Sequence, residues 1–340
     1  MSWLKPMPAN PVVAVAGATG AVGSEMLLAL GQRGFPAAQI KALASTRSAG
    51  KRLPFLNGEL VVEEMTPESF SGVDIALFSA GASISRQFRE AVVSAGAVMI
   101  DNSSAFRMDS DVPLIVPEVN AHEVLNHSGV IANPNCSTIQ MVVALKPLHD
   151  LAPIKRVVVS TYQAASGAGA AAMDELYNQT RQFLNGEPLT IDKFAHQIAF
   201  NCIPHIDVFL DDDSTKEEWK MVVETQKIMA DDTIAVSATC VRVPVLRCHA
   251  ESINVEFNSP VSVSEAKEAW SAASGVILID EPASKLYPMP GLLSGTDATY
   301  IGRIRKDHSI ENGLNFWVVA DQLRKGAALN AVQIAELLLP

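Results

Sequence analysis

The sequence is poor in cysteine and lacks any long apolar run. Its 340 residues include only four cysteines, and no two of them form a Cys-x-x-Cys pair. That spacing excludes a dense disulfide framework and the common zinc-binding patterns, and it favours free thiols in a reducing compartment. We therefore expect a cytoplasmic protein that binds no metal. Charge or proline interrupts every apolar stretch before the length of about 18 residues that a membrane span needs, so no membrane association is expected.

Signal-peptide features and excess basic charge are also missing. Residues 1–11 contain one lysine, three prolines and no apolar run, which is not the pattern of a signal peptide. The net charge is −11, whereas general nucleic-acid binding needs a basic face. A local basic pocket for a phosphorylated small molecule is compatible with this charge. At 48% hydrophobic and 19% charged residues, the chain is long enough for a sizeable core and for two domains.

A strand, a glycine-rich turn and a helix are predicted near the N-terminus. Residues 11–16 form an apolar run, glycines follow at positions 17, 20 and 23, and an amphipathic pattern continues to about Arg33. In that context the glycines predict a dinucleotide-binding turn, because they bring a pyrophosphate close to the N–H groups of a helix N-terminus. A merely structural turn is the alternative.

The next strand, residues 40–44, ends in Ser45-Thr46-Arg47-Ser48. NAD sites commonly carry an acidic residue at this strand end to hold the ribose 2′-hydroxyl, and none stands here. Hydroxyl groups and an arginine suit a 2′-phosphate instead, so the sequence favours NADP over NAD. The alternative is a solvated loop with Arg47 exposed.

Strand and helix patterns continue to alternate up to residue 132. Strands are predicted at 73–79, 97–101 and 130–132, a helix at 83–95, and a short apolar run at 114–116. This alternation predicts an α/β fold with a doubly wound parallel sheet. The loop from Asn102 to Arg107 would then lie at the carboxyl edge of the sheet, where hydroxyls and an arginine suit an anion. Taken alone, however, Arg107 is by default interpreted as a surface charge.

Cys136 lies in the stretch Asn133-Pro134-Asn135-Cys136-Ser137-Thr138, between a strand end and a helix predicted at 139–151. A thiol within the first helical turn experiences the positive end of the helix dipole and unpaired N–H groups, which favour thiolate and can hold an oxyanion. These features indicate a nucleophile. The alternative is a buried cysteine that packs as a small hydrophobe. Packing is the role that we assign to the other three cysteines, Cys202, Cys240 and Cys248.

Two predicted strands in the second half of the chain carry polar residues that are candidates for catalysis or substrate binding. A strand at 156–163 ends in Gln163, a candidate for orienting a substrate, and a strand at 233–246 contains Arg242. An arginine among valines needs an anionic partner if it is buried, from the protein or from a substrate. His249 is predicted in a loop between strands, where a histidine is a candidate acid or base.

A helix is predicted from Glu217 to Ile228, after the exposed acidic turn Asp211-Asp212-Asp213. Ser214-Thr215-Lys216-Glu217 is a candidate capping box for its start. Glu217 and Lys220 share one face of this helix, and a surface ion pair is the default interpretation.

Together these motifs resemble the bacterial aspartate-β-semialdehyde dehydrogenases over essentially the whole chain. Six motifs occur in the order of that family: Gly17–Gly23, Asn102–Arg107, Asn133–Thr138, Tyr162–Gly169, Arg242–Val245 with His249, and Ala320–Ala328. The resemblance implies reversible, NADP-dependent interconversion of L-aspartate 4-semialdehyde and L-4-aspartyl phosphate, with release or uptake of inorganic phosphate. That reaction is an early step towards lysine, diaminopimelate, threonine and methionine.

Residue roles follow from the resemblance, position by position. Cys136 would be the nucleophile and His249 the acid or base, with Gln163 orienting the substrate. Arg242 would bind the substrate carboxylate and Glu217 its amino group. Phosphate would be bound by Arg107 and Lys220. The coenzyme would be lined by Gly17, Thr19, Gly20, Ala21, Val22, Ser45, Arg47, Ser48, Ser166, Gly167 and Gln322.

The resemblance also implies two domains. A Rossmann-like domain, residues 1–132, would be completed by the C-terminal helix, residues 321–340, and residues 133–320 would form a mixed α/β domain for catalysis and dimerisation. A homodimer is therefore expected. Two alternatives stay open: an N-acetyl-γ-glutamyl-phosphate reductase, which shares this plan and a cysteine thioester, and an inert NADP-binding paralogue. The neighbours of Cys136 disfavour the first, since its motif has Gly before the cysteine and Tyr after it. Retention of all four candidate residues (Cys136, Gln163, Arg242 and His249) disfavours the second.

Overall fold

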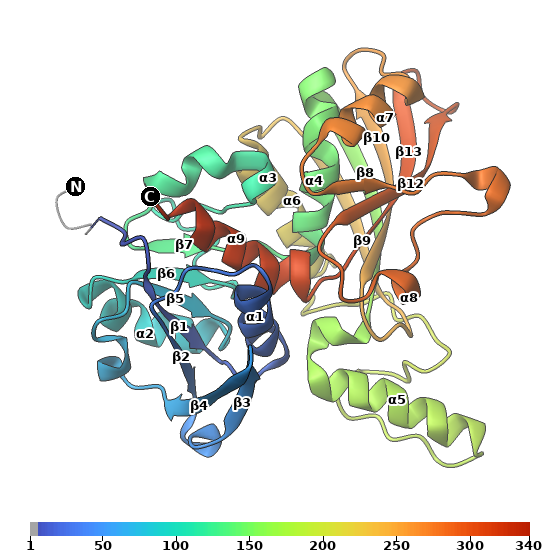
Figure 1. Cartoon of the computed structure of the whole chain (residues 1–340). Helices are drawn as coiled ribbons and strands as arrows, with labels where there is room; N and C mark the ends of the chain where they lie inside the picture. The colour runs from blue at the N-terminus through green and yellow to red at the C-terminus, as the bar shows by residue number, and fades with distance from the viewer. Residues whose placement is uncertain (1–5) are drawn as a thin grey trace. The chain divides into compact units, whose positions relative to one another are not determined.

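The computed structural model describes residues 6–340 and divides into two compact units (Figure 1). One unit runs up to Asn135 and includes Ala327–Pro340, and the other comprises Cys136–Gly326. These limits lie three and six residues beyond the domain boundaries expected from the sequence. The signal-peptide argument rests partly on residues 1–5, which lie outside the described residues. Within the described part, no helix is long and apolar enough to cross a membrane.

The first unit is built on a seven-stranded sheet in the order β3-β4-β2-β1-β5-β6-β7. Neighbouring strands are parallel except for β3 and β4, so the predicted doubly wound α/β sheet is confirmed. Its strands are β1 Val12–Ala16, β2 Gln39–Ala44, β3 Arg52–Phe55, β4 Gly58–Glu64, β5 Ile75–Phe78, β6 Val98–Asp101 and β7 Val130–Ala132. Its helices are α1 Ala21–Gln32, α2 Ala82–Ser94, α3 Pro117–Asn120 and α9 Leu329–Leu337.

The β3-β4 hairpin was not predicted, because its strands carry few buried apolar residues. Most β4 side chains are exposed, with Val62 as the buried exception. The run at 114–116 forms only an isolated bridge, from Leu114 to Ala132, and a short helix follows it. Mostly exposed strands give a weak hydrophobic pattern, so sequence reasoning overlooks them.

The C-terminal helix α9 packs into the core of the first unit. Ala331, Val332 and Ile334 share a buried cluster with Val13 and Val15 of the central strand. In Figure 1 α9, in red, lies beside α1, in dark blue. The single C-terminal helix expected at residues 321–340 is wrong at its start, because residues 324–328 form a wider π-helical turn before α9 begins.

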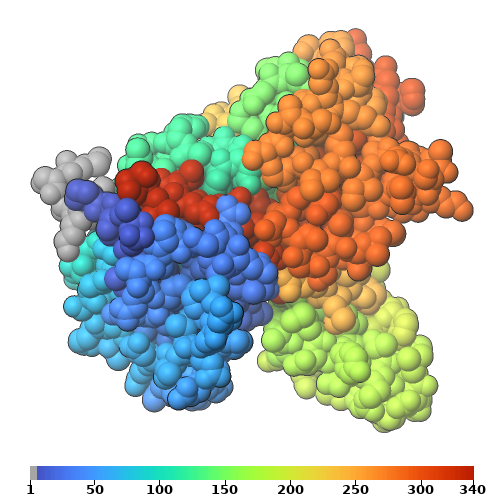
Figure 2. Space-filling model, in the orientation of Figure 1, coloured from blue at the N-terminus to red at the C-terminus, as the bar shows by residue number. Residues whose placement is uncertain are grey.

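The second unit contains a six-stranded mixed sheet in the order β11-β12-β13-β10-β8-β9. Its strands are β8 Ile154–Gln163, β9 Ala235–Arg242, β10 His249–Phe257, β11 Val276–Leu278, β12 Thr299–Asp307 and β13 Gly313–Ala320. Its helices are α4 Cys136–Leu151, α5 Ala170–Leu184, α6 Lys216–Met229, α7 Val263–Ala272 and α8 Pro290–Leu293. Helices α4, α6 and α7 pack together on the sheet. Helix α5 and the segment after it have a small core of their own and form a separate lobe of this unit, coloured yellow-green in Figure 2.

Two details of this sheet differ from expectation and shape the site. The strand predicted at 233–246 stops at Arg242, because Pro244 cannot continue a ladder of backbone hydrogen bonds. His249 is the first residue of β10 and does not lie in a loop. Strand register sets Gln163 opposite Arg242 on β9, while His249 lies opposite Ala320 on β13. The three polar side chains therefore come from the adjacent ends of β9, β8 and β10.

Candidate active site

Cys136 is the first residue of α4 and is partly buried. The predicted position of the thiol, within the first turn of a helix, is thereby confirmed. Close packing limits the space around it: a Cβ added at Gly326 would lie only 2.9 Å from the Cβ of Cys136. A thiol held at this helix end can act as a nucleophile whose anion the helix dipole favours.

Ala164 links Arg242 and His249 through its backbone. Its N–H donates to Nδ1 of His249 at 3.0 Å, and its carbonyl accepts from Nη1 of Arg242 at 2.7 Å. Both side chains are buried, so neither can relax into solvent. One residue thus fixes an imidazole and a guanidinium next to each other at the end of β8.

His249 is neutral in this setting. Burial and the nearby charge of Arg242 hold the pKa of His249 well below its ordinary value. Because Nδ1 accepts the Ala164 N–H, the hydrogen of the neutral ring is assigned to Nε2. Within the described residues Nε2 has no hydrogen-bond partner, so it can donate to a substrate oxygen.

Arg242 keeps its charge near several anionic groups. Burial lowers the pKa of Arg242, and the negative charge of Glu217, together with that of Cys136 when it is ionised, opposes that change. A thiolate at Cys136 and this guanidinium would therefore stabilise each other. A buried guanidinium with fixed geometry can also bind a carboxylate in bidentate fashion.

Position 167 has no room for a side chain, which explains why it is a glycine. A Cβ at this position would lie 2.7 Å from Nη1 of Arg242 and 3.0 Å from Nε2 of His249. The neighbouring Ser166 accepts a hydrogen bond from Nε2 of Gln322, whose Oε1 accepts the Cys248 N–H at 2.8 Å. The structure thus joins Ser166 and Gln322, two predicted coenzyme residues, in one buried pair next to Gly167.

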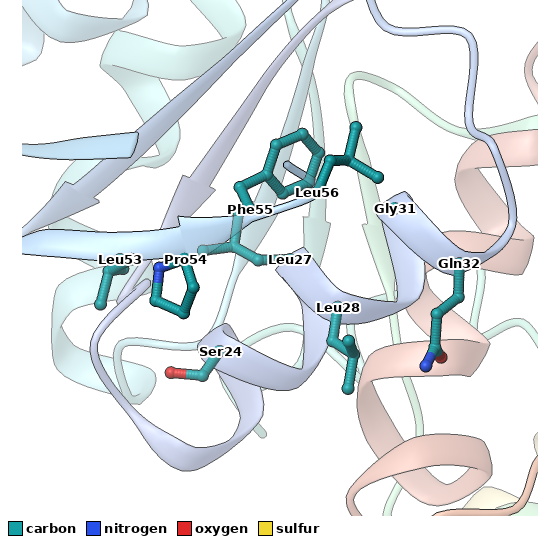
Figure 3. A pocket seen from close by; sticks show the side chains of 9 residues that line it. All are labelled: Ser24, Leu27, Leu28, Gly31, Gln32, Leu53, Pro54, Phe55 and Leu56. Carbon is teal, nitrogen blue, oxygen red and sulfur yellow. The ribbon is translucent and has the colours of Figure 1, made fainter. Parts of the chain in front are cut away.

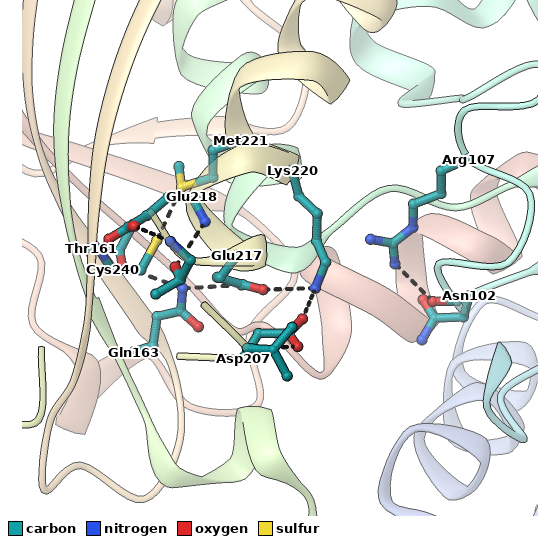
Figure 4. Close-up of polar contacts among 12 residues, drawn as sticks. Asn102, Arg107, Thr161, Gln163, Asp207, Glu217, Glu218, Lys220, Met221 and Cys240 are labelled. Atoms are coloured by element: carbon teal, nitrogen blue, oxygen red, sulfur yellow. Dashed lines mark hydrogen bonds and ion pairs between the residues drawn. The ribbon is translucent and has the colours of Figure 1, made fainter. Parts of the chain in front are cut away.

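A polar chain runs from the sheet to helix α6 (Figure 4). Gln163 Nε2 donates to Glu217 at 3.2 Å, and Lys220 Nζ contacts Glu217 at 3.1 Å and Asp207 at 2.6 Å. The Glu217 and Lys220 side chains are 6% and 11% exposed, so a plain surface ion pair is wrong. Burial alone would lower the pKa of Lys220, but the charge of Glu217 and the hydrogen bond that Lys220 donates to Asp207 outweigh it and raise that pKa.

The capping box of α6 is one residue later than predicted. Thr215 is the N-cap and its partner is Glu218, whereas Ser214 and Glu217 were expected. Because Glu218 is the capping residue, Glu217 does not cap the helix. Its side chain is buried and accepts a hydrogen bond from Gln163. The acidic turn 211–213 is exposed, as predicted.

Arg107, in the first unit, is buried and is not a surface charge. Its Nε donates to the carbonyl of Asn133 at 2.9 Å. Its Nη2 donates to the carbonyl of Asn102 at 3.0 Å (Figure 4). Asn133 in turn receives a hydrogen bond from Asn330 of α9, at 2.6 Å. Sequence reasoning missed Asn330, because nothing local connects position 330 with position 133.

The glycine turn of the first unit is tightly packed. A Cβ at Gly17 would lie 2.3 Å from the Ser79 carbonyl, and one at Gly23 would lie 2.1 Å from the Gly17 carbonyl. Helix α1 begins at Ala21 with no side-chain cap and no acidic residue in its first turn. The turn residues are partly or fully accessible, at Thr19, Gly20, Ala21 and Val22. An uncapped helix N-terminus of this kind can hold a phosphate group.

The loop at 45–48 contains an acidic neighbour that the sequence did not reveal. Ser45, Thr46 and Arg47 are exposed, and Thr46 Oγ1 donates to Glu64. Glu64 ends β4 and stands opposite Ala44 in the parallel pairing with β2. An acidic residue therefore does lie at this strand end, contributed by a strand that was not predicted.

A hydrophobic cavity of about 500 Å³ lies between α1 and the β3-β4 hairpin (Figure 3). It is lined by Ser24, Leu27, Leu28, Gly31, Gln32, Leu53, Pro54, Phe55 and Leu56. None of the predicted coenzyme residues lines it.

The remaining cysteines differ sharply from Cys136. Burial raises the pKa of the Cys248 thiol to about 12 and raises that of Cys240 further still. Both pack as buried small side chains, as predicted, whereas Cys202 is exposed. Among the described residues, no group of three His, Cys, Asp or Glu side chains is arranged to hold a metal ion.

Comparisons with known proteins identify the family. The model "Semialdehyde dehydrogenase, NAD binding domain" matches residues 12–127, and "Semialdehyde dehydrogenase, dimerisation domain" matches residues 145–325. The aspartate-semialdehyde dehydrogenase of Aquifex aeolicus (strain VF5) is 56% identical over 96% of this chain and 97% of its own length. A crystal structure of Vibrio cholerae aspartate semialdehyde dehydrogenase II, complexed with ASA, superposes with a TM-score of 0.95 at 48% identity, covering 97% of this chain and 98% of the other. The Candida albicans enzyme, crystallised with NADP, gives a TM-score of 0.75 at 27% identity over 97% and 98% of the chains. The chain therefore belongs to the aspartate-semialdehyde dehydrogenase family of oxidoreductases.

Proposed function

We propose that this enzyme interconverts L-4-aspartyl phosphate and L-aspartate 4-semialdehyde through a thioester on Cys136, with NADP as the coenzyme. The observation that carries the proposal is the buried group in the second unit. Arg242 and His249 are fixed by Ala164, and Glu217 is fixed by Gln163. These residues supply a cation, a hydrogen-bond donor and an anion. That set suits an amino acid with a carboxylate, a reacting carbonyl and an ammonium group.

In the reductive direction, the Cys136 thiolate attacks the acyl phosphate carbon. The bond to phosphate breaks, phosphate leaves, and a thioester forms, which splits one difficult step into two. The helix N-terminus at Cys136 and the Arg242 guanidinium stabilise the sulfur anion before the attack. Lys220 and Arg107 are assigned to phosphate, and Glu217 to the substrate ammonium group.

His249 would donate a hydrogen bond to the reacting oxygen of the substrate. Bound NADP(H) would supply the hydride donor or acceptor. When the thioester carbonyl is reduced, its oxygen carries negative charge, and the Nε2–H of His249 can donate to it. Collapse of that oxyanion breaks the carbon–sulfur bond, releases the aldehyde and restores the thiolate. In the reverse direction the Cys136 thiolate attacks the aldehyde carbon, and the same Nε2–H would stabilise the hemithioacetal oxyanion that forms before hydride is lost; this is the part we propose for His249 in the acid–base chemistry.

The glycine turn and the loop at 45–48 support the coenzyme assignment. The packing of Gly17 and Gly23 and the uncapped start of α1 fit a pyrophosphate. Arg47 and Ser48 are the candidates for the 2′-phosphate, and the Candida albicans relative was crystallised with NADP. Glu64 is the observation that weakens the preference for NADP, since it adds negative charge beside Thr46.

The biological setting is proposed from the family. We infer a role in the biosynthesis of lysine, diaminopimelate, threonine and methionine, in the cytoplasm, by a homodimer. The match to a dimerisation domain over residues 145–325 supports the dimer.

The decisive experiment is a phosphate-dependent assay of aldehyde oxidation. Purified protein, L-aspartate 4-semialdehyde, phosphate and NADP⁺ are mixed and NADPH absorbance is followed, with Cys136→Ala and the exposed-thiol control Cys202→Ala alongside. We expect activity in the natural protein and in Cys202→Ala, and none in Cys136→Ala. Activity that survives in Cys136→Ala would overturn the thioester. Turnover of N-acetyl-γ-glutamyl phosphate in place of aspartyl phosphate would overturn the substrate.

A further inference from the structure

A buried carboxyl group lies directly behind the residues assigned to catalysis. Glu251 follows His249 by two positions on β10, and side chains two apart on a strand share one face. Its register partner on β8 is Thr161, two residues before Gln163. Glu251 is 0% exposed. A potentially charged group therefore lies in the second row of side chains beneath His249 and Gln163.

Gln140 faces Glu251 from the helix of the nucleophile. It lies four residues after Cys136 on α4, one turn further along the same face, and it is also 0% exposed. Helix α4 contacts strand β10, and the Gln140 amide partly offsets the rise in the pKa of Glu251, so the two side chains lie close together. Yet neither carboxyl oxygen of Glu251 and neither amide atom of Gln140 has a hydrogen-bond partner of normal geometry among the described residues.

Four unpartnered polar atoms in two adjacent buried side chains call for a physical explanation. Unmade hydrogen bonds in a buried site are costly, and native structures satisfy nearly all of them. Burial raises the pKa of Glu251 well above its ordinary value and so favours its neutral, protonated form. A neutral acid offers one O–H donor and one carbonyl acceptor, and a primary amide offers the matching N–H and carbonyl.

We propose that Glu251 and Gln140 form a mutually hydrogen-bonded acid–amide pair, directly or through one buried water, which fixes the start of α4 against the strand that carries His249. The pair connects the two elements whose first residues are Cys136 and His249. Glu251 and Gln140 are thus positioning residues that act through these two side chains. The inference rests on the proposed function only in taking Cys136 as the nucleophile.

The test uses Glu251→Leu, Gln140→Leu and the exchanged double variant Gln140→Glu/Glu251→Gln. Two rates are measured: alkylation of Cys136 by iodoacetamide, followed by mass spectrometry of its peptide, and kcat with saturating substrates. Each leucine variant leaves its partner unsatisfied and should lower both rates about tenfold or more, since small displacements of reacting groups cost that much. The exchanged variant keeps an acid opposite an amide, so both of its rates should lie within about twofold of those of the natural protein.

Thr299→Val is the matched control. Thr299 lies on β12 of the same sheet, is 0% exposed, and its hydroxyl also lacks a partner among the described residues. This variant should leave both rates unchanged. An equal loss in Thr299→Val, or an exchanged variant no faster than the slower leucine variant, would overturn the pair and leave only a general effect of core substitution.

A second measurement does not depend on the folding of the leucine variants. The infrared difference spectrum between the natural protein and Glu251→Gln at neutral pH should contain the carbonyl band of a protonated carboxylic acid. Carboxylate bands in its place would overturn the neutral acid. Failure of Cys136 in the natural protein to react with iodoacetamide would instead contradict the proposed nucleophile, so the two failures are distinguishable.

Discussion

Lys220 Nζ lies 2.6 Å from Oδ2 of Asp207, a residue with a positive φ of 69° in the loop before α6. The cation that we assign to phosphate is thus already paired with a carboxylate besides Glu217. The hydrogen bond and charge of Lys220 outweigh the effect of burial and lower the pKa of Asp207, so Asp207 is ionised at neutral pH. A phosphate dianion that approaches Lys220 must compete with this anion or be repelled by it.

Asp207→Asn is therefore expected to strengthen phosphate binding. Removal of one negative charge next to Lys220 should lower the KM for phosphate by about three- to tenfold in the oxidative assay, with little change in kcat. Asp211→Asn is the control, because it removes the same charge from the exposed turn. A higher KM for phosphate in Asp207→Asn would show that Asp207 serves to hold Lys220 in position.

Arg47→Ala tests the coenzyme assignment. If Arg47 pairs with the 2′-phosphate, its loss should raise the KM for NADP⁺ about tenfold and leave the KM for NAD⁺ unchanged. Glu64→Gln should act in the opposite sense, lowering the KM for NADP⁺, since it removes the negative charge beside Thr46. Equal effects on both coenzymes would contradict contact with the 2′-phosphate.

Gly167→Ala tests the close packing of the residues that we propose for catalysis. The added methyl would lie 2.7 Å from Arg242 and 3.0 Å from His249, so the ends of both side chains must shift. We expect kcat to fall about 100-fold, because misplacement of reacting groups by about 1 Å has that effect. Gly291→Ala is the control, since a Cβ there meets no atom within 4 Å. An unchanged kcat in Gly167→Ala would contradict the roles proposed for Arg242 and His249 in the reaction.

Local pattern was enough to predict most of the fold and the positions of the principal chemical groups. The glycine turn, the thiol at a helix start and the strand that ends in Gln163 each have a signal within a few residues. Their roles in the reaction stay predictions. What made these elements predictable is that hydrophobic period and turn chemistry are local properties.

The features that were missed depend on distant pairing. Glu64 became relevant only because β4, a mostly exposed strand, pairs with β2. Asn330 contacts Asn133 although 197 positions separate them in the sequence. Such contacts leave no trace in a window of neighbouring residues. The capping box of α6 was misplaced for a local reason, because the spacing of Ser214 and Glu217 fits that motif as well as the spacing of Thr215 and Glu218, which the structure uses.

Glu251 also predicts how stability changes with pH. Its pKa is raised well above 4.5 in the folded protein, so above about pH 4.5 the folded state binds a proton that the unfolded chain has released. Stability contributed by this group is therefore fully present below the unfolded pKa and is lost as pH rises towards the folded pKa. The loss amounts to at most about 1.4 kcal/mol per pH unit. Glu251→Gln removes this titratable group. Between pH 5 and pH 7, the free energy of unfolding of Glu251→Gln minus that of the natural protein, both measured by urea denaturation, should increase by up to about 1.4 kcal/mol per pH unit. A constant difference between the two proteins over that range would mean that Glu251 is ionised when folded.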